Sequence, residues 1–158
     1  MNLLIAADDA RRDDVRALVA RHLEYANEMT PPAHVHALGD DGLADPAVTM
    51  FSARLDGVLV AIGALRELDA IHGEVKSMHT AAEARRRGLG SALLDHLVSV
   101  ARQRGYRQVS LETGTGEAFA PARSLYATRG FVQCEPFGAY TVNAYSVCMT
   151  LALDGGSA

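Results

Sequence analysis

An Asp-Gly pair at residues 56–57 lies between two mostly apolar stretches, and it constrains the fold more than any other feature of the sequence. The stretches are 48–55, VTMFSARL, and 58–65, VLVAIGAL. Asp-Gly readily adopts the two positive φ angles of the tight turns that match the twist of paired strands, so the sequence predicts an antiparallel hairpin. The segment 71–80, IHGEVKSMHT, is predicted as the third strand of the same meander.

The rest of the chain alternates between strand-like and helix-like segments. Residues 2–6, NLLIA, are predicted as a short buried strand, followed by a helix that Asp13 and Asp14 can cap. The loop-like stretch 29–46 separates this helix from the hairpin. The later segments are the helices 87–104 and 121–129 and the strands 107–113, 131–135 and 146–153. This order predicts an α/β (α+β) fold, with one domain over residues 1–153 and a flexible C-terminal tail over 154–158.

The two long helices each carry apolar residues along one side. In the first helix these are Val15, Leu18, Val19, His22, Leu23 and Ala26. In the helix 87–104 they are Leu89, Ala92, Leu93, Leu97, Val100 and Ala101. Gly105 follows this second helix and indicates its C-terminal end.

Charge and cysteine content limit the function classes. The chain has 158 residues and a formal net charge of −4, which argues against non-specific binding to nucleic acid or to membranes. Its first residues turn acidic too early for a signal peptide, and no apolar run reaches membrane-spanning length. Cys134 and Cys148 are too few for a disulfide framework. We therefore expect a cytoplasmic protein with reduced thiols and with neither a nucleic-acid nor a membrane partner.

Positive charge and glycine gather at one helix entrance, in residues 83–94, EARRRGLGSALL. The first amides of a helix lack partners and carry partial positive charge, and Gly88 and Gly90 let a ligand approach them. The arginines at 85–87 strengthen the attraction for an anion, so the stretch predicts a phosphate site. The Walker pattern is absent, and the dinucleotide fingerprint fails because Leu93 stands at its third small position. A tight turn with solvated arginines is the alternative interpretation.

Read as Arg-x-x-Gly-x-Gly, with Arg85, Gly88 and Gly90, this stretch resembles the pyrophosphate-binding motif of the GNAT acetyltransferase superfamily. The resemblance extends to the blocks HGEVKSM, LETGTGEAFAPARSLY and SVCMTL, which are similar to one bacterial subgroup of that superfamily. It implies a mixed, mostly antiparallel central sheet of about 6–7 strands, splayed in the middle and flanked by about 4 helices. It also implies acetyl-CoA as the acetyl donor and, because members are often dimers, a homodimer.

The resemblance assigns the cofactor contacts mainly to the main chain. The end of the strand 71–80 would bind the pantetheine arm and separate from the next strand at Leu111 and Glu112 to admit it. A backbone N–H of Met78 or His79 could also polarise the thioester carbonyl. The expected cofactor-binding residues are Met78, His79 and Thr80 on the strand and Arg85, Arg86, Arg87, Gly88, Leu89, Gly90 and Ser91 around the pyrophosphate.

The resemblance also implies three catalytic side chains. An ammonium must lose a proton before it attacks, and Glu74 and Glu112 each match a glutamate that is the general base in some members, with Glu74 favoured. Tyr126 lies where the superfamily's tyrosine approaches the CoA sulfur and is expected to be the general acid. Lys76 either pairs with Glu74 or helps to hold a substrate carboxylate. Phe119 stands where many members have an asparagine, so no side-chain hydrogen bond is expected there.

Regular alternation along the strand 71–80 decides which of its side chains share a face. Glu74, Lys76 and Met78 are expected on one face, and Val75, Ser77 and His79 on the other.

The sequence therefore predicts an acyl-CoA-dependent N-acetyltransferase. The acetyl group of acetyl-CoA would pass to a primary amine of a small or amino-acid-like acceptor, by direct attack in a ternary complex. Two alternatives stay open: a GNAT-fold module that binds or senses CoA without efficient catalysis, and an enzyme that acetylates protein or peptide N-termini. No metal ion is expected, because His34, His36, His72 and His79 show none of the usual ligand spacings.

Overall fold

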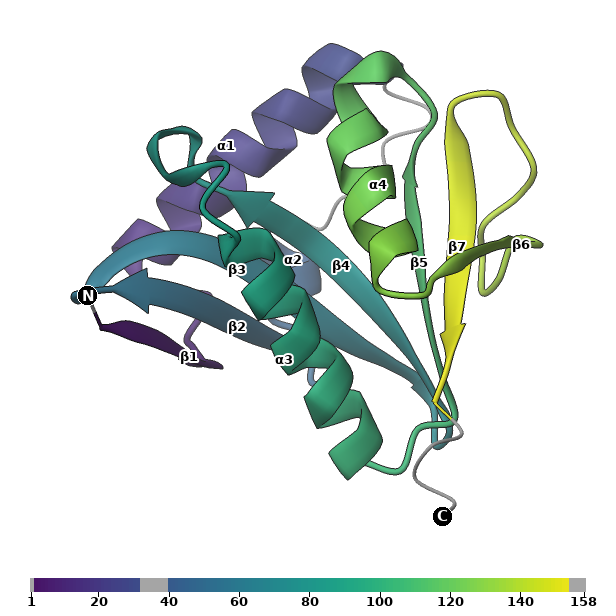
Figure 1. The fold of residues 1–158 in the computed structure, drawn as a ribbon, viewed down its shortest axis with the longest axis horizontal. Helices are drawn as coiled ribbons and strands as arrows, with labels where there is room; N and C mark the ends of the chain where they lie inside the picture. The colour runs from purple at the N-terminus through teal and green to yellow at the C-terminus, as the bar shows by residue number, and fades with distance from the viewer. Residues whose placement is uncertain (1, 32–39, 154–158) are drawn as a thin grey trace.

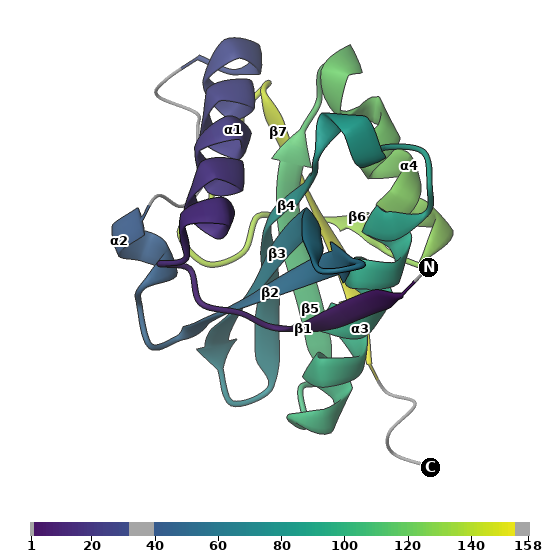
Figure 2. The ribbon, with the colours of Figure 1, turned by 90° about the vertical axis from the view of Figure 1, so that its left-hand side faces the viewer.

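The computed structural model of the chain describes residues 2–31 and 40–153, which form a seven-stranded sheet with helices on both faces (Figures 1 and 2). The strands are β1 (Leu3–Ala7), β2 (Val48–Leu55), β3 (Val58–Asp69), β4 (His72–Thr80), β5 (Gln108–Gly114), β6 (Val132–Cys134) and β7 (Ser146–Ala152). They lie in the order β1-β2-β3-β4-β5-β7-β6, and only β4 and β5 are parallel neighbours. The predicted mixed, mostly antiparallel sheet is confirmed. The predictions for His34, His36 and the tail 154–158 lie outside the described residues.

The hairpin of β2 and β3 has the turn that its sequence predicts. Asp56 and Gly57 have φ angles of 52° and 86°, the positive pair of a type I′ turn. β4 pairs antiparallel with β3 and completes the predicted meander. β3 extends to Asp69, past the predicted end at residue 65, because it continues to pair with β4.

Figure 2 shows α1 and α2 on one face of the sheet and α3 and α4 on the other. The helices are α1 (Asp13–Met29), α2 (Asp40–Leu43), α3 (Leu89–Gln103) and α4 (Ala120–Thr128), with 3₁₀ turns η2 (Ala82–Ala84) and η3 (Glu117–Phe119). None of the helices among the described residues is long and apolar enough to cross a membrane.

The buried side of α3 is wider than its sequence predicts. Leu89, Leu93, Leu97 and Ala101 are buried as expected, Leu94 and Val98 are buried as well, and Ala92 and Val100 are only partly buried. The helix ends at Gln103, one residue before the predicted end, and Gly105 follows it with a φ of 82°, as expected of a glycine in the C-terminal cap. The amide of Tyr106 then bonds to the carbonyl of Ala101 at 3.1 Å, which completes the usual glycine-dependent cap.

A bulge interrupts β4 in its middle. Lys76 lies opposite Ala64 of β3, and His79 lies opposite Ile62. Between these two pairs β4 therefore has one residue more than β3, which is a β-bulge. Ser77, with a φ of 56°, lies in this bulge. Because Ala64 and Ile62 point to one face of the sheet, Lys76 and His79 share that face.

The bulge overturns the faces predicted from regular alternation. Glu74, Lys76 and His79 lie on the face that carries α1, where His79 contacts His22. Met78 lies on the opposite face, since a side chain at Gly63 would meet the sulfur of Met78 together with leucines of α3. The prediction that Met78 shares a face with Glu74 is therefore wrong, because one inserted residue reverses the alternation beyond it.

The parallel neighbours β4 and β5 pair only over their first residues. His72, Gly73 and Glu74 lie opposite Gln108, Val109 and Ser110. Beyond Glu74 the two strands are no longer paired, and Figure 1 shows them diverging between α1 and α4. The predicted splay in the middle of the sheet is confirmed.

Two predictions near the N-terminus are wrong. β1 is an edge strand rather than a buried one, with Leu3 and Leu4 39% and 59% exposed, because it pairs with β2 at the margin of the sheet. Asp13 and Asp14 lie in the first turn of α1, and the N-cap is Arg12. The two carboxylates still favour the start of the helix, since negative charge there interacts well with the helix dipole.

Candidate active site

The parted ends of β4 and β5 enclose a cavity of about 150 Å³, and α1 and α4 supply most of the remaining wall. Its lining contains the three side chains predicted to be catalytic, which are Glu74, Glu112 and Tyr126. Met78 and His79 also line it. Thr80 and the charged loop 85–91 lie outside this lining, at the end of β4 and the start of α3.

Glu74, Lys76 and Tyr140 form a closed hydrogen-bonded group beside the cavity. Nζ of Lys76 lies 3.2 Å from Oε2 of Glu74 and 2.6 Å from Oη of Tyr140. Oη of Tyr140 lies 2.5 Å from the same carboxylate oxygen. An ammonium only donates and a carboxylate only accepts, so the hydroxyl accepts from Lys76 and donates to Glu74. Of the two roles open to Lys76, pairing with Glu74 is the one that the structure contains.

The two charged members of this group are buried, with Glu74 only 1% and Lys76 only 9% exposed. Removing two charges from water is costly, so each depends on the other and on the bonds that complete their hydrogen-bonding capacity. Burial and the neighbouring carboxylate of Glu74 raise the pKa of Tyr140. Its hydroxyl therefore keeps its proton at neutral pH and remains a donor to Glu74.

Tyr140 reaches Glu74 from a distant part of the chain. It belongs to the connection between β6 and β7, and in the strand order β7 and β5 lie between that connection and β4. Phe137 supports it, with ring centroids 5.1 Å from Tyr140 and 5.8 Å from His72. No local pattern indicates this residue, because its partners Lys76 and Glu74 are 64 and 66 residues away in the sequence.

Glu112 is the second carboxylate of the cavity and is half-buried on β5. It lies opposite Cys148 where β5 pairs with β7. Its charge contributes to the raised pKa of Tyr140, after burial and Glu74, which places it near the buried group. Two carboxylates therefore border one cavity, and either could accept a proton from a bound amine.

Tyr126 lies on α4 with only 7% of its surface exposed. Its ring packs against Phe131, with centroids 5.9 Å apart. Burial raises the pKa of Tyr126 to about 12, so the phenol is protonated at neutral pH. A protonated phenol in the cavity wall can donate to a departing anion, which is what a general acid must do.

α1 adds an aromatic wall that the sequence pattern does not indicate. Nδ1 of His22 lies 3.2 Å from Nδ1 of His79, and Tyr25 packs edge-on against His79. Oη of Tyr25 donates to the carbonyl of Ala118 at 2.7 Å and so ties α1 to the segment before α4. Burial is the main cause that lowers the pKa of His22 and of His79 to about 4, so the pair is neutral at pH 7. In the sequence, His22 is only a member of the apolar face of a helix.

Phe119, which stands where many members of the superfamily have an asparagine, contributes packing rather than a side-chain hydrogen bond. Its ring lies edge-on to Tyr25, with centroids 5.7 Å apart. It also covers Gly114, where any side chain would collide with it. The rings of Phe119 and Tyr25 therefore form one part of the cavity wall.

The charged loop meets the start of α3 where the sequence predicts an anion site. Gly88 is the N-cap, with a φ of 76°. The first bond of the helix is donated by Ala92 to the carbonyl of Gly88, so the amides of residues 89–91 lie ahead of the helical ladder. Nε of Arg85 bonds to the carbonyl of Thr80 at 3.2 Å and fastens the loop to the end of β4.

The space beside these amides is open at both glycines. No atom lies within 4 Å of a Cβ built on Gly88. A Cβ built on Gly90 meets only Thr80 and Leu125, at ordinary contact distances of 3.5 and 3.6 Å. The arginines at 85–87 are exposed, so positive charge and main-chain donors are accessible together. Among the residues that the structure describes, no three His, Cys, Asp or Glu side chains gather where they could hold a metal ion.

Comparison with known sequences finds acetyltransferases. Residues 12–131 match the sequence model described as the Acetyltransferase (GNAT) family. The chain is 44% identical over 149 residues to the uncharacterized N-acetyltransferase YsnE of Bacillus subtilis (strain 168), covering 94% of this chain and 99% of that protein. It is 32% identical over 149 residues to the IAA acetyltransferase of Azospirillum brasilense, covering 94% of this chain and 96% of that protein.

Solved structures have the same fold. A protein of Klebsiella pneumoniae subsp. pneumoniae named as an acyl-CoA N-acyltransferase matches with a TM-score of 0.77 and 26% identity, over 96% of this chain and 97% of that one. A GNAT family acetyltransferase of Elizabethkingia anophelis, whose crystal structure has acetyl-CoA bound, matches with a TM-score of 0.68 over 96% of this chain and 99% of that one. At 15% identity, this second match concerns the fold alone.

Proposed function

Because the chain belongs to the GNAT acetyltransferase family and is an acyl-CoA-dependent N-acetyltransferase, we propose that it acetylates the primary amine of a small or amino-acid-like acceptor. The observation that carries this proposal is the cavity between β4 and β5, where two carboxylates and the protonated Tyr126 meet. Similarity to the IAA acetyltransferase of Azospirillum brasilense supports a small-molecule acceptor.

The amine must lose a proton before it attacks, and Glu74 is the base that we favour. The bonds from Lys76 and Tyr140 both end on Oε2 of Glu74 and hold the carboxylate in one orientation. We assign its other oxygen, Oε1, to the proton of the acceptor. Glu112 is the alternative base, either directly or through a water molecule.

Acetyl-CoA supplies the acetyl group as a thioester, and the chain binds and polarises it. The amides of residues 86–91, with Arg85 beside them, would hold the diphosphate. A backbone N–H of Met78 or His79 would polarise the thioester carbonyl as the amine attacks in a ternary complex. Tyr126 would donate a proton to the departing thiolate.

Thiol release with a panel of small amines tests this function and separates the two carboxylates. Glu74→Gln should lower acceptor-dependent release by roughly 100-fold or more, and Glu112→Gln should lower it less, because only the base is needed to remove the proton. Acetyl-CoA binding, measured by calorimetry, should persist in both variants. The reverse order of the two losses would assign Glu112 as the base.

Two other outcomes would favour the alternatives. If the wild-type protein binds CoA tightly but none of the amines causes it to release thiol, the protein is a binding or sensing module. Release with peptides and with none of the small amines would indicate acetylation of peptide N-termini. We also propose a homodimer and a cytoplasmic location, and light scattering after size exclusion tests the first.

A further inference from the structure

Ser77 carries a buried hydroxyl that has no hydrogen-bond partner in the part of the chain that the structure describes. The residue is 8% exposed and lines the same cavity as Glu74 and Tyr126. Among the residues that the structure describes, its Oγ is the one buried side-chain oxygen or nitrogen without a hydrogen-bond partner. Such groups are rare, because an unpaired hydroxyl gives up its bonds to water without replacement. Because Ser77 also lines the cavity, a ligand bound there can supply the missing hydrogen-bond partner.

The backbone of Ser77 is unfavourable as well. Its φ of 56° lies in the left-handed region, at the bulge of β4, where glycine is the usual residue. A glycine here would relieve the backbone and also remove the unpaired hydroxyl. Ser77 therefore has both a strained backbone and an unpaired hydroxyl, at the point where β4 has parted from β5. Strain of this kind persists at sites that bind ligands.

The chemistry of the neighbouring groups narrows what Ser77 can bind. Lys76 and Oε2 of Glu74 already bond to each other and to Tyr140. A serine hydroxyl has one hydrogen to donate, and a carbonyl oxygen is a suitable acceptor for it. An acyl-CoA presents carbonyl oxygens at its thioester and at the amides of its pantetheine arm, the part that the proposed function lays between β4 and β5.

We propose that the hydroxyl of Ser77 donates a hydrogen bond to a carbonyl oxygen of the bound acyl-CoA, at the thioester or at an amide of the pantetheine arm. This inference rests on the proposed function. Ser77 makes and breaks no covalent bond. It adds one side-chain donor to the main-chain donors expected from Met78 and His79.

Ser77→Ala isolates the hydroxyl, because alanine keeps the Cβ and hence the same backbone cost. The midpoint of thermal unfolding of the ligand-free variant should rise by about 2–4 °C, since an unpaired buried group is removed. Its affinity for acetyl-CoA, measured by calorimetry, should fall about three- to tenfold, the effect of one lost hydrogen bond.

Ser110→Ala is the matched control for stability. Ser110 is 0% exposed, and its hydroxyl bonds to Nε2 of His72 at 2.8 Å and to Oγ1 of Thr150 at 2.9 Å. Removing a hydroxyl that has partners should lower the thermal midpoint, because His72 and Thr150 then lose a bond. The two serine variants should therefore shift the midpoint in opposite directions.

Free CoA distinguishes the two carbonyl positions. A loss of affinity confined to acetyl-CoA assigns the bond to the thioester, and an equal loss for CoA assigns it to the pantetheine arm; both support the inference. Unchanged affinity for both ligands, or a thermal midpoint that falls as in Ser110→Ala, would overturn it. Wild-type protein that binds neither ligand would overturn the proposed function, and this inference with it.

Discussion

Tyr140 is the residue that completes the buried pair of Glu74 and Lys76. Its hydroxyl accepts a bond from Lys76 and donates one to the carboxylate. Hydrogen bonds to charged groups are stronger than those between neutral groups, and this one fixes the orientation of Glu74. If Glu74 takes the proton of the acceptor, Tyr140 positions the base without touching the substrate.

Tyr140→Phe should therefore lower kcat by about 10- to 100-fold, because a base held less well spends less time in line with the amine. Phenylalanine keeps the ring and its contact with Phe137, so the connection between β6 and β7 should stay in place. The Kd of acetyl-CoA should change little. Steady-state kinetics with the acceptor and calorimetry with acetyl-CoA measure the two quantities.

Tyr106→Phe is the matched control. Tyr106 is 3% exposed, and its hydroxyl donates to Oε1 of Glu67 at 2.8 Å, outside the cavity lining. Both phenylalanine variants should lose about 1.5–3 kcal/mol of unfolding free energy, because each loses a hydrogen bond to a carboxylate, but Tyr106→Phe should keep kcat within about twofold of wild type. The same kcat in both variants would mean that Tyr140 stabilises the fold but does not position Glu74 for catalysis.

The residues that could be read from the sequence differ from the others in where they lie along the chain. Glu74, Glu112 and Tyr126 belong to the blocks that carry the family resemblance, and the three do share one cavity. Tyr140 and His22 join them from the connection between β6 and β7 and from α1. Their positions beside the other three residues depend on how elements distant in sequence pack together, and the spacing of residues within one segment does not predict that packing.

At the scale of elements, α3 has glycine with positive φ at both ends. Gly88 and Gly105 have φ angles of 76° and 82°, and a Cβ on either would have no atom within 4 Å. Alanine at either position would therefore strain the backbone by about 1 kcal/mol without a collision. Only Gly88 lies among the amides that would bind the diphosphate.

Gly88→Ala and Gly105→Ala should thus lower the free energy of unfolding by similar amounts, about 1 kcal/mol each. Only Gly88→Ala should weaken CoA binding, by about tenfold, because relieving its φ turns the amides of the first helical turn away from the ligand. Urea unfolding and calorimetry with CoA measure the two effects. Equal CoA affinity in the two variants would contradict an anion site at this helix entrance.

The elements also show what limits a prediction from sequence. The hairpin could be predicted because Asp56 and Gly57 alone determine its turn. The bulge in β4 could not, because its left-handed position holds Ser77 where glycine would have indicated it. The exposure of β1 could not either, since an apolar run does not reveal that its strand lies at the edge of the sheet.

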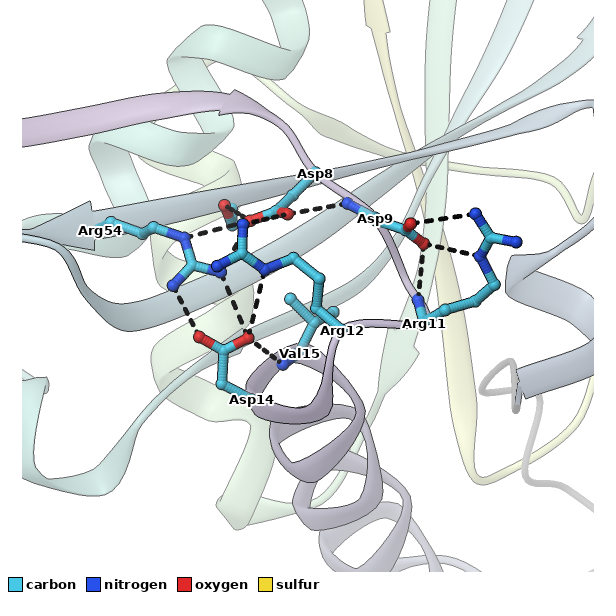
Figure 3. Close-up of polar contacts among 8 residues, drawn as sticks. Asp8, Asp9, Arg11, Arg12, Asp14, Val15 and Arg54 are labelled. Carbon is cyan, nitrogen blue, oxygen red and sulfur yellow. Dashed lines mark hydrogen bonds and ion pairs between the residues drawn. The ribbon is translucent and has the colours of Figure 1, made fainter.

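At the scale of the whole molecule, one network of charges joins the segment after β1 and the first turn of α1 to β2 (Figure 3). Arg54 on β2 lies 2.9 Å from Asp8, just after β1, and 2.6 Å from Asp14, in the first turn of α1. Ser52 donates a further bond to Asp8 at 2.5 Å. Because α1 carries His22 into the cavity, this network supports one wall of the site.

The same network should make stability depend on pH in the acid range. Burial raises the pKa of Asp8, but the hydrogen bonds from Ser52 and Arg54 outweigh it and hold this pKa below its usual value. The bond from Arg54 also lowers the pKa of Asp14. A carboxyl whose pKa is lower in the folded state adds stability above its unfolded pKa of about 4, and this stability is lost as pH falls through the folded pKa.

Arg54→Met should lower the free energy of unfolding at pH 7 by about 1–2 kcal/mol, because the partly buried Asp8 loses its closest cation. It should also flatten the loss of stability between about pH 5 and pH 3, since the pKa values of Asp8 and Asp14 return toward normal. Arg129→Met is the control, because it breaks an exposed pair with Asp95, 2.8 Å apart with side chains 37% and 57% exposed. This control should cost less than about 0.5 kcal/mol and keep the wild-type pH dependence. Urea unfolding at each pH measures all three proteins, and parallel curves for wild type and Arg54→Met would show that the network does not link α1 to the sheet.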